Sequence, residues 1–139
     1  MKIYLYFIGK PKDPHINAVA GDFLGRVARY APAEMREIRP GRVDPWERHP
    51  GARKILLDPG GRSLDSAAFS KLISRGEMEG RDLVFVVGGH DGLPEGWAGR
   101  ADLLISLSPL TFPHELARAV LAEQIYRAFA SLRGHPYPR

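Results

Sequence analysis

Five apolar residues, Leu83 to Val87, run without interruption and stop at two adjacent glycines. An apolar run of this length, bounded by turn residues, is typical of a strand that is covered on both faces. Such strands belong to parallel sheets, because the crossover helices of a parallel sheet pack on both of its faces. The run therefore favours an α/β fold built on a mainly parallel sheet.

The rest of the chain repeats this alternation of strand and helix. Further strands are predicted at residues 2–9, 54–58 and 103–108, with a weaker one at 34–39. Helices are predicted at residues 15–31, at 63–76 with Gly76 as the stop, at 113–133, and briefly around Trp97. Residues 40–53 hold three prolines and two glycines, which predict a loop. The alternation indicates a single α/β domain over residues 1–139, with helices flanking the sheet.

The last helix has the clearest signals in the chain. Pro113 lies in its first turn, Glu115 suits its positive end, and Gly134 is predicted to end it. Glu123 and Arg127 are spaced to pair on one face. The apolar stripe is predicted to comprise Leu116, Val120, Leu121, Ile125, Phe129 and Leu132.

Composition narrows the class of protein. With 139 residues, of which 44% are hydrophobic, the chain suits one ordinary globular core rather than a disordered segment. It contains no cysteine, which excludes disulfides and thiolate metal sites. The sequence shows no signal-peptide pattern and no apolar run of membrane-spanning length, so we expect a soluble cytoplasmic protein with no membrane partner.

The net charge of +4 comes mostly from arginine. One interpretation is a surface that contacts the phosphate backbone of a nucleic acid. The alternative is a solvated face, because net charge describes association and solubility rather than fold. The basic residues in the middle of the chain are Arg26, Arg29, Arg36, Arg39, Arg42, Arg48, Arg53, Lys54 and Arg62.

Several catalytic motifs are incomplete or absent. The segment "HELAR", residues 114–118, places Arg118 where a zinc peptidase needs its second histidine. A guanidinium cation does not ligate zinc, and the five histidines are scattered, so no metal site is expected. There is no G-x-S-x-G elbow and no lysine after a glycine-rich loop, which disfavours hydrolases and phosphoryl transfer.

Three predicted strand ends are rich in glycine or polar residues, at 58–61, 88–92 and 106–111. Open α/β sheets bind ligands at the carboxyl ends of their strands, so this clustering favours a small ligand held largely by backbone groups. For "GGHDG" itself, the alternative is a plain tight turn. Turn formation is the main role expected of His90 and Asp91.

The words "VGGHDGLP" and "LSPLTFPHELARAVLAEQIYRAF", followed by the ending "GHPYPR", resemble the RlmH family of SPOUT-class RNA methyltransferases in wording, order and spacing. The resemblance implies an α/β domain whose C-terminal part is tied into a deep trefoil knot, an exception to the rule that chains are unknotted. It also implies S-adenosyl-L-methionine as cofactor and a homodimer as the active unit. The implied reaction is methylation of N3 of a pseudouridine in 23S ribosomal RNA, on the large ribosomal subunit or the assembled ribosome.

The same resemblance assigns the cofactor site. Gly88 and Gly89 would let the backbone approach the cofactor where a Cβ atom would collide. For Leu57 the alternative is a simple core position, and for Pro113 it is the start of a helix. The cofactor contacts implied by the resemblance are Leu57, Gly88, Gly89, Ser108, Pro109, Leu110, Thr111, Phe112 and Pro113.

The C-terminal tail departs from the family pattern. The resemblance places Tyr137 and Arg139 near the target base, but Pro138 stands where the family has a histidine. We expect His135 or Arg139 to take over the local role. The alternative is that the family histidine only contacts RNA. A methyltransferase for another RNA base, and a non-catalytic ribosome-binding or assembly factor, are the alternative functions.

Overall fold

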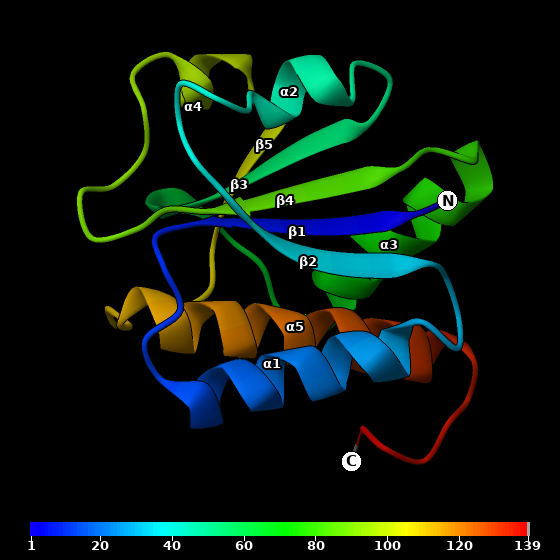
Figure 1. The fold of residues 1–139 in the computed structure, drawn as a ribbon. Helices are drawn as coiled ribbons and strands as arrows, with labels where there is room; N and C mark the ends of the chain where they lie inside the picture. The colour runs from blue at the N-terminus through cyan, green and yellow to red at the C-terminus, as the bar shows by residue number, and fades with distance from the viewer. Residues whose placement is uncertain (139) are drawn as a thin grey trace.

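The computed structural model describes residues 1–138 and contains one sheet of five strands, in the order β2-β1-β4-β3-β5 (Figure 1). All four neighbouring pairs are parallel, which confirms the predicted α/β fold. Because the strands are parallel, their carboxyl ends share one edge of the sheet. The strands are β1 (Ile3–Ile8), β2 (Ala33–Ile38), β3 (Arg53–Ser63), β4 (Leu83–Val87) and β5 (Leu103–Ser106).

Helices cover both faces of the sheet, as Figure 1 shows. Helices α1, α3 and α5 lie on one face, and the short α2 and α4 lie on the other. None of the helices in the described chain is both long and apolar enough to cross a membrane. The helices are α1 (Pro14–Val27), α2 (Pro45–Arg48), α3 (Ser66–Glu79), α4 (Trp97–Arg100) and α5 (His114–Leu132).

The alternation of side chains along each strand divides the core between the two faces. In β1, Leu5 and Phe7 point toward α1, α3 and α5 and join the larger apolar cluster. Tyr6 points the other way and joins Trp46 and Trp97 in a second cluster under α2 and α4. All five residues of β4 are buried, as its continuous apolar run predicts.

Local sequence signals explain where the helices begin. The carboxylate of Asp13 accepts hydrogen bonds from the backbone nitrogens of His15 and Ile16, and Pro14 fills the first turn of α1. Asp65 caps α3 in the same way through the nitrogen of Ala68. Each of these helices therefore starts at an aspartate that satisfies otherwise unpaired backbone donors.

Strand β3 is longer than predicted. The prediction ended it at Pro59, but its register shifts between Leu57 and Arg62 and pairing with β5 then resumes. A Cβ atom on Gly61 would lie 2.8 Å from the backbone of Ile105, so the glycine permits this close crossing. The breaker residues therefore form a bulge within the strand rather than its end.

Helix α3 continues past Gly76, the predicted stop, and ends at Gly80, whose φ of 62° is in the left-handed region. Gly76 is buried, and a Cβ atom there would lie 2.9 Å from the sulfur of Met1. Gly76 is therefore required by close packing rather than by the end of the helix.

The predicted loop at residues 40–53 also contains the short helix α2. Asp44 caps this helix, because its carboxylate accepts hydrogen bonds from the backbone nitrogens of Trp46 and Glu47.

The predicted bounds of α5 agree with the structure to within one residue at each end, but its predicted apolar stripe is partly wrong. Leu116 and Leu132 are exposed, and Arg118 is completely buried. The helix packs on both α1 and α3, so alanines as well as large apolar residues are enclosed. The knot expected from the family resemblance stays a prediction.

Candidate functional site

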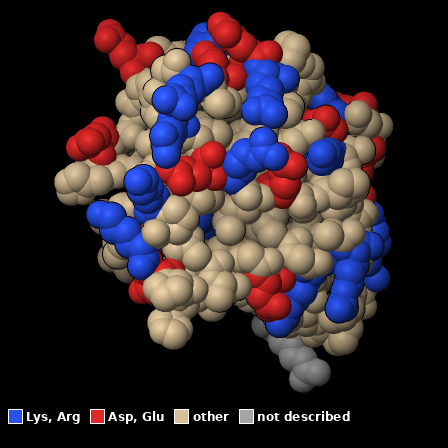
Figure 2. Space-filling model, viewed as in Figure 1, with Lys and Arg blue, Asp and Glu red and all other residues tan. Residues whose placement is uncertain are grey.

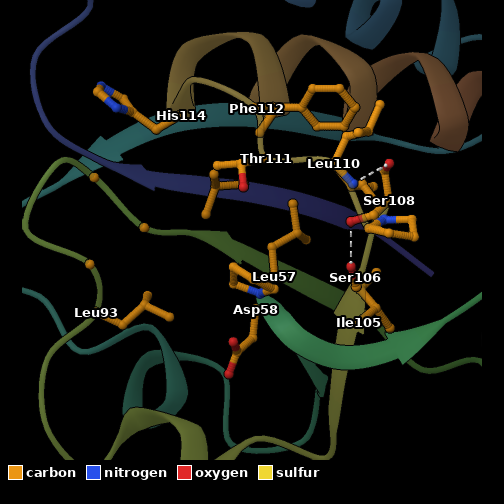
Figure 3. Close-up of a pocket in the computed structure, with 18 residues that line it drawn as sticks. Leu57, Asp58, Leu93, Ile105, Ser106, Ser108, Leu110, Thr111, Phe112 and His114 are labelled. Carbon is orange, nitrogen blue, oxygen red and sulfur yellow. Dashed lines mark hydrogen bonds between the residues drawn. The ribbon is translucent and has the colours of Figure 1, made fainter.

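A cavity of about 260 Å³ opens beside the bulge of β3 and the carboxyl ends of β4 and β5 (Figure 3). Its walls come from this bulge and from the loops after β4 and β5, three segments that are far apart in sequence and that the sheet brings together. Apolar side chains and backbone groups form most of the lining. The lining residues are Leu57, Asp58, Pro59, Val87, Gly88, Gly89, Gly92, Leu93, Ile105, Ser106, Leu107, Ser108, Pro109, Leu110, Thr111, Phe112, His114 and Ala117.

The glycine turn after β4 forms one wall of this cavity. The nitrogen of Gly92 donates a hydrogen bond to the carbonyl of Gly89 at 3.0 Å, and the two residues form an isolated antiparallel bridge. His90 and Asp91 occupy the centre of the turn, which confirms the role expected of them. Gly92 has a φ of 78°, a conformation that favours glycine.

The two glycines that follow β4 lie close to the backbone of other residues. A Cβ atom on Gly89 would lie 2.7 Å from the carbonyl oxygen of Ile8, and one on Gly88 would lie 3.1 Å from the carbonyl oxygen of Gly92. Close approach of neighbouring backbone is therefore one reason for glycine at these positions, and both residues also lie in the cavity wall. Their contact with a cofactor stays a prediction.

The loop between β5 and α5 forms the facing wall. The hydroxyl of Ser106 donates to the carbonyl of Ser108 at 3.0 Å, and the nitrogen of Leu110 donates to the hydroxyl of Ser108 at 2.9 Å (Figure 3). These bonds hold the loop in a compact turn. Leu110 is 74% exposed, a large apolar side chain left open to solvent beside the cavity.

Leu57 and Thr111 point toward one another across the cavity in Figure 3, while Asp58 and His114 point away. Leu57 also packs against the larger core cluster, so it belongs to both the core and the cavity. Pro113 is absent from the lining. It precedes α5, and its carbonyl accepts from the nitrogen of Ala117 at 2.9 Å. Its contact with a cofactor stays a prediction.

The C-terminal tail packs far from this cavity within one chain. The hydroxyl of Tyr137 donates to the carboxylate of Glu123 at 3.2 Å, and its ring centroid lies 4.7 Å from that of Tyr126. His135 accepts through Nδ1 from the nitrogen of Tyr137 at 3.1 Å. Arg139 lies outside the described residues. Burial, followed by the charge of Glu123, raises the pKa of the Tyr137 phenol.

The separation between tail and cavity follows from the length of α5. Ala117 lines the cavity, and Tyr126 comes nine residues later on the same helix. At 1.5 Å per residue this corresponds to about 13 Å along the axis. The Glu123–Arg127 pair predicted from spacing is present at 2.9 Å and lies beside the tail. One chain therefore does not bring its own tail residues to its own cavity.

A buried polar network, missed from the sequence, joins α5 to the start of α1. Arg118 is 0% exposed, and its guanidinium carbon lies 3.5 Å from the ring centroid of Phe7. Its Nη1 donates to Asn17 Oδ1 at 2.5 Å. Burial lowers the pKa of Arg118, and the nearby carboxylates of Glu115 and Glu37 oppose this effect. The sequence did hold one signal for this network, since Arg118 is spaced along the helix like the buried apolar residues Leu121 and Ile125.

The arginine-rich middle of the chain does not form a patch of one sign on the face shown in Figure 2, where basic and acidic side chains are interspersed. Arg26 pairs with Asp22 at 3.0 Å, and Arg36 lies 3.8 Å from Glu34. These two arginines therefore fit the solvated-face interpretation. Phosphate binding by the rest stays a prediction.

Comparison with known proteins places the chain in a family. The sequence profile described as "Predicted SPOUT methyltransferase" matches residues 1–138. A relative from Solibacter usitatus, named ribosomal RNA large subunit methyltransferase H, is 73% identical over the full length of both chains. A relative of the same name from Thermus thermophilus is 38% identical, covering 100% of this chain and 99% of the relative. This chain belongs to the RlmH family of SPOUT methyltransferases.

Solved structures share the fold of this RlmH-family chain at low identity. A probable methylase family protein from Haemophilus influenzae superposes with a TM-score of 0.65 at 10% identity, covering 99% of this chain and 70% of the other. The SpoU methyltransferase AviRb from Streptomyces viridochromogenes, solved in complex with AdoMet, gives a TM-score of 0.55 at 16% identity, covering 94% of this chain and 61% of that one. These likenesses support the fold.

Proposed function

We propose that this protein transfers the methyl group of S-adenosyl-L-methionine to N3 of a pseudouridine in 23S ribosomal RNA, acting on the large ribosomal subunit or the assembled ribosome in the cytoplasm. The full-length, 73% identity to a ribosomal RNA large subunit methyltransferase H carries the proposal. The cavity at the strand ends supports it, because eight of the nine residues expected to contact the cofactor line that cavity. Those residues come from strand β3 and from the loops after β4 and β5, so their convergence is not a consequence of sequence proximity.

The lining of the cavity fits the proposed cofactor. Apolar side chains such as Leu57 and Leu93 can enclose a planar ring, while exposed backbone groups of the loop at 106–112 can bind its polar edge. When bound, the cofactor supplies an electrophilic sulfonium methyl group. The protein then has to align the nucleophile with that methyl group and exclude water. Leu110, exposed at the mouth of the cavity, would cover a bound ligand.

The tail supplies the groups that handle the substrate base. Burial and the charge of Glu123 raise the pKa of the Tyr137 phenol, which favours a hydrogen-bonding role over removal of the N3 proton. His135 is the described tail residue that we expect to take over the role of the family's histidine, and its Nδ1 accepts a hydrogen bond from the nitrogen of Tyr137. Its loss should therefore slow methyl transfer. An undiminished rate in the His135→Ala variant would exclude this role.

The active unit is a homodimer in which the tail of one protomer reaches the cavity of its partner. Two features favour this arrangement. The tail and cavity of one chain lie at different positions along α5, and an open groove beside the tail exposes two glycines of α1. A Cβ atom on Gly21 or Gly25 would meet nothing within 4 Å. Two helical glycines cost about 2 kcal/mol relative to alanine, a cost that close packing of a second chain would offset.

The decisive experiment incubates the purified protein and labelled S-adenosyl-L-methionine with ribosomes from cells lacking this protein. Nuclease digestion and mass spectrometry then locate the label. Methylation at N3 of a pseudouridine in 23S ribosomal RNA is expected. Label at another base would favour the alternative target that Pro138 suggests. Cofactor binding without any label would favour the non-catalytic ribosome-binding alternative.

A further inference from the structure

The loop between β1 and α1, residues 9–13, is fixed to α5 by a single carboxylate. Glu115 accepts hydrogen bonds from the backbone nitrogen of Lys12 at 2.5 Å and from that of Asp13 at 3.2 Å. The side chain of Asn17 adds a third bond to Glu115 at 3.1 Å and also donates to the carbonyl of Asp13 at 2.8 Å. Three of these four bonds are made by the backbone of residues 9–13, so the loop is held both to α5 and to α1.

Arg118 anchors this network from beneath. Its guanidinium stacks on Phe7 of β1 and donates to Asn17 of α1, so one side chain of α5 holds both elements that flank the loop. Its Nε and Nη2 have no hydrogen-bond partner among the described residues, which is unusual for a completely buried arginine. Burying the guanidinium of Arg118 costs free energy, and its position indicates that it serves to hold the elements on either side of the loop.

The loop lies next to segments that line the proposed cofactor cavity. Ile8, just before it, lies directly beside Gly89 in the cavity wall. On the other side, His114 and Ala117 of α5 line the same cavity and flank Glu115, to which the loop is bound. The segments on both sides of the loop therefore contact the wall of the cavity.

Two cations stand on this loop without an acidic partner. Lys10 and Lys12 are exposed, and neither has a carboxylate oxygen within 4.0 Å of its amine among the described residues. The nearby carboxylates are already engaged, since Asp13 accepts from two backbone nitrogens of α1 and Glu115 accepts from the loop. The local acids are therefore held by backbone donors, and the two amines remain available to an anion outside the chain.

We infer that Lys10 and Lys12 contact backbone phosphates of the RNA strand that carries the target nucleoside, with Glu115, Asn17 and Arg118 as the residues that position them. This inference rests on the proposed function. A base that enters the cavity brings its own phosphates close to this loop, where fixed cations bind them with little ordering cost. Lysine is suited to this role as a strongly hydrated point charge that reads no base.

The test compares Lys10→Gln, Lys12→Gln and the double variant with Lys71→Gln, an exposed lysine on α3 outside both the loop and the cavity lining. Affinity for ribosomes lacking the modification is measured across a range of salt concentrations, and cofactor affinity is measured separately by calorimetry. Each lost phosphate contact should reduce the slope of log affinity against log salt by about 0.7 for a single strand. The double variant should therefore lose about 1.4, with Lys71→Gln and cofactor affinity unchanged.

A fourth variant tests whether the position of the two lysines matters in addition to their charge. Asn17→Ala keeps both lysines but removes two bonds that hold the loop, together with the hydrogen bond from Arg118, so it should weaken ribosome binding while keeping the salt slope of the wild type. An unchanged slope in the double variant overturns the inference, as does an equal loss in Lys71→Gln or the absence of ribosome binding by the wild type. Normal binding with the expected slopes but no methyl transfer would refute the proposed function and leave the phosphate contacts standing.

Discussion

The carbonyl oxygen of Ile8 lies 2.7 Å from the position that a Cβ atom on Gly89 would occupy. Real Cβ atoms do not approach an oxygen this closely, and the oxygen belongs to backbone that cannot rotate away. Gly89→Ala should therefore destabilise the fold by about 1–3 kcal/mol. Because the displaced turn forms a wall of the cavity, cofactor affinity should fall as well. Urea unfolding and calorimetry measure the two effects.

The matched control for this variant is Gly51→Ala. Gly51 is exposed, and a Cβ atom there would meet nothing within 4 Å. Its stability should change by no more than about 0.5 kcal/mol. If both alanine variants behaved alike, the contact with Ile8 would not be what requires glycine at position 89.

Arg118→Ala should destabilise the protein by about 2–4 kcal/mol, because it removes the stacking on Phe7, opens a cavity and leaves the side-chain carbonyl of Asn17 without its donor. Arg118→Met retains the packing of the aliphatic stem and removes the buried charge. We expect this variant to lose much less stability. Chemical unfolding curves for the two variants provide the comparison. Equal losses would assign the whole effect to the guanidinium rather than to packing.

The fold was predictable where a signal was local and repeated. The apolar run of β4 and the boundary residues Pro113 and Gly134 of α5 each indicate their element without reference to the rest of the chain. Predictions failed where a distant neighbour decides the outcome. Gly76 looks like a helix stop until Met1 and Leu83 are seen to fill the space around it. Arg118 looks like a surface residue until Phe7 and the start of α1 enclose it.

The candidate site was also predictable only where the signal was local. The convergence of the glycine-rich segment of β3 with the loops after β4 and β5 follows from the parallel sheet, so the cavity could be anticipated. The role of Glu115 could not, because its partners at Lys12 and Asp13 are about a hundred residues away in sequence. The packing of Tyr137 on the side of α5 likewise depends on tertiary contacts that no local pattern reports.

The stability of the protein should rise with pH around the ordinary pKa of histidine because of His49. Its Nε2 lies 2.7 Å from the hydroxyl of Tyr6, and burial followed by the charge of Arg48 lowers the pKa of His49. A lowered pKa means that the unfolded chain binds more protons near and below pH 6.5 than the folded chain does. The contribution of His49 is therefore complete above its unfolded pKa and is lost as the pH falls through its folded pKa.

The measurement compares the wild type with His49→Gln, whose amide can still accept a hydrogen bond from Tyr6 but does not titrate. Unfolding free energies are determined at pH 7.5 and again at pH 5.5. Carboxylates titrate in both proteins, so the difference between them isolates the histidine. We expect the wild type to lose more stability than the variant on acidification. A larger loss in the variant would reverse the assigned direction.

A shared active site predicts rescue between two inactive variants. Thr111→Trp should fill the cavity, because Thr111 points into it, and Tyr137→Ala should remove a tail residue that handles the substrate base. Heterodimers containing one chain of each kind, purified with two different tags after co-expression, pair one intact cavity with one intact tail. If the tail acts on the partner's cavity, these heterodimers should recover about half the wild-type rate of methyl transfer, since one of two symmetric sites is complete. If each tail served its own cavity, both sites would carry a defect, and the heterodimer would be as inactive as its parents.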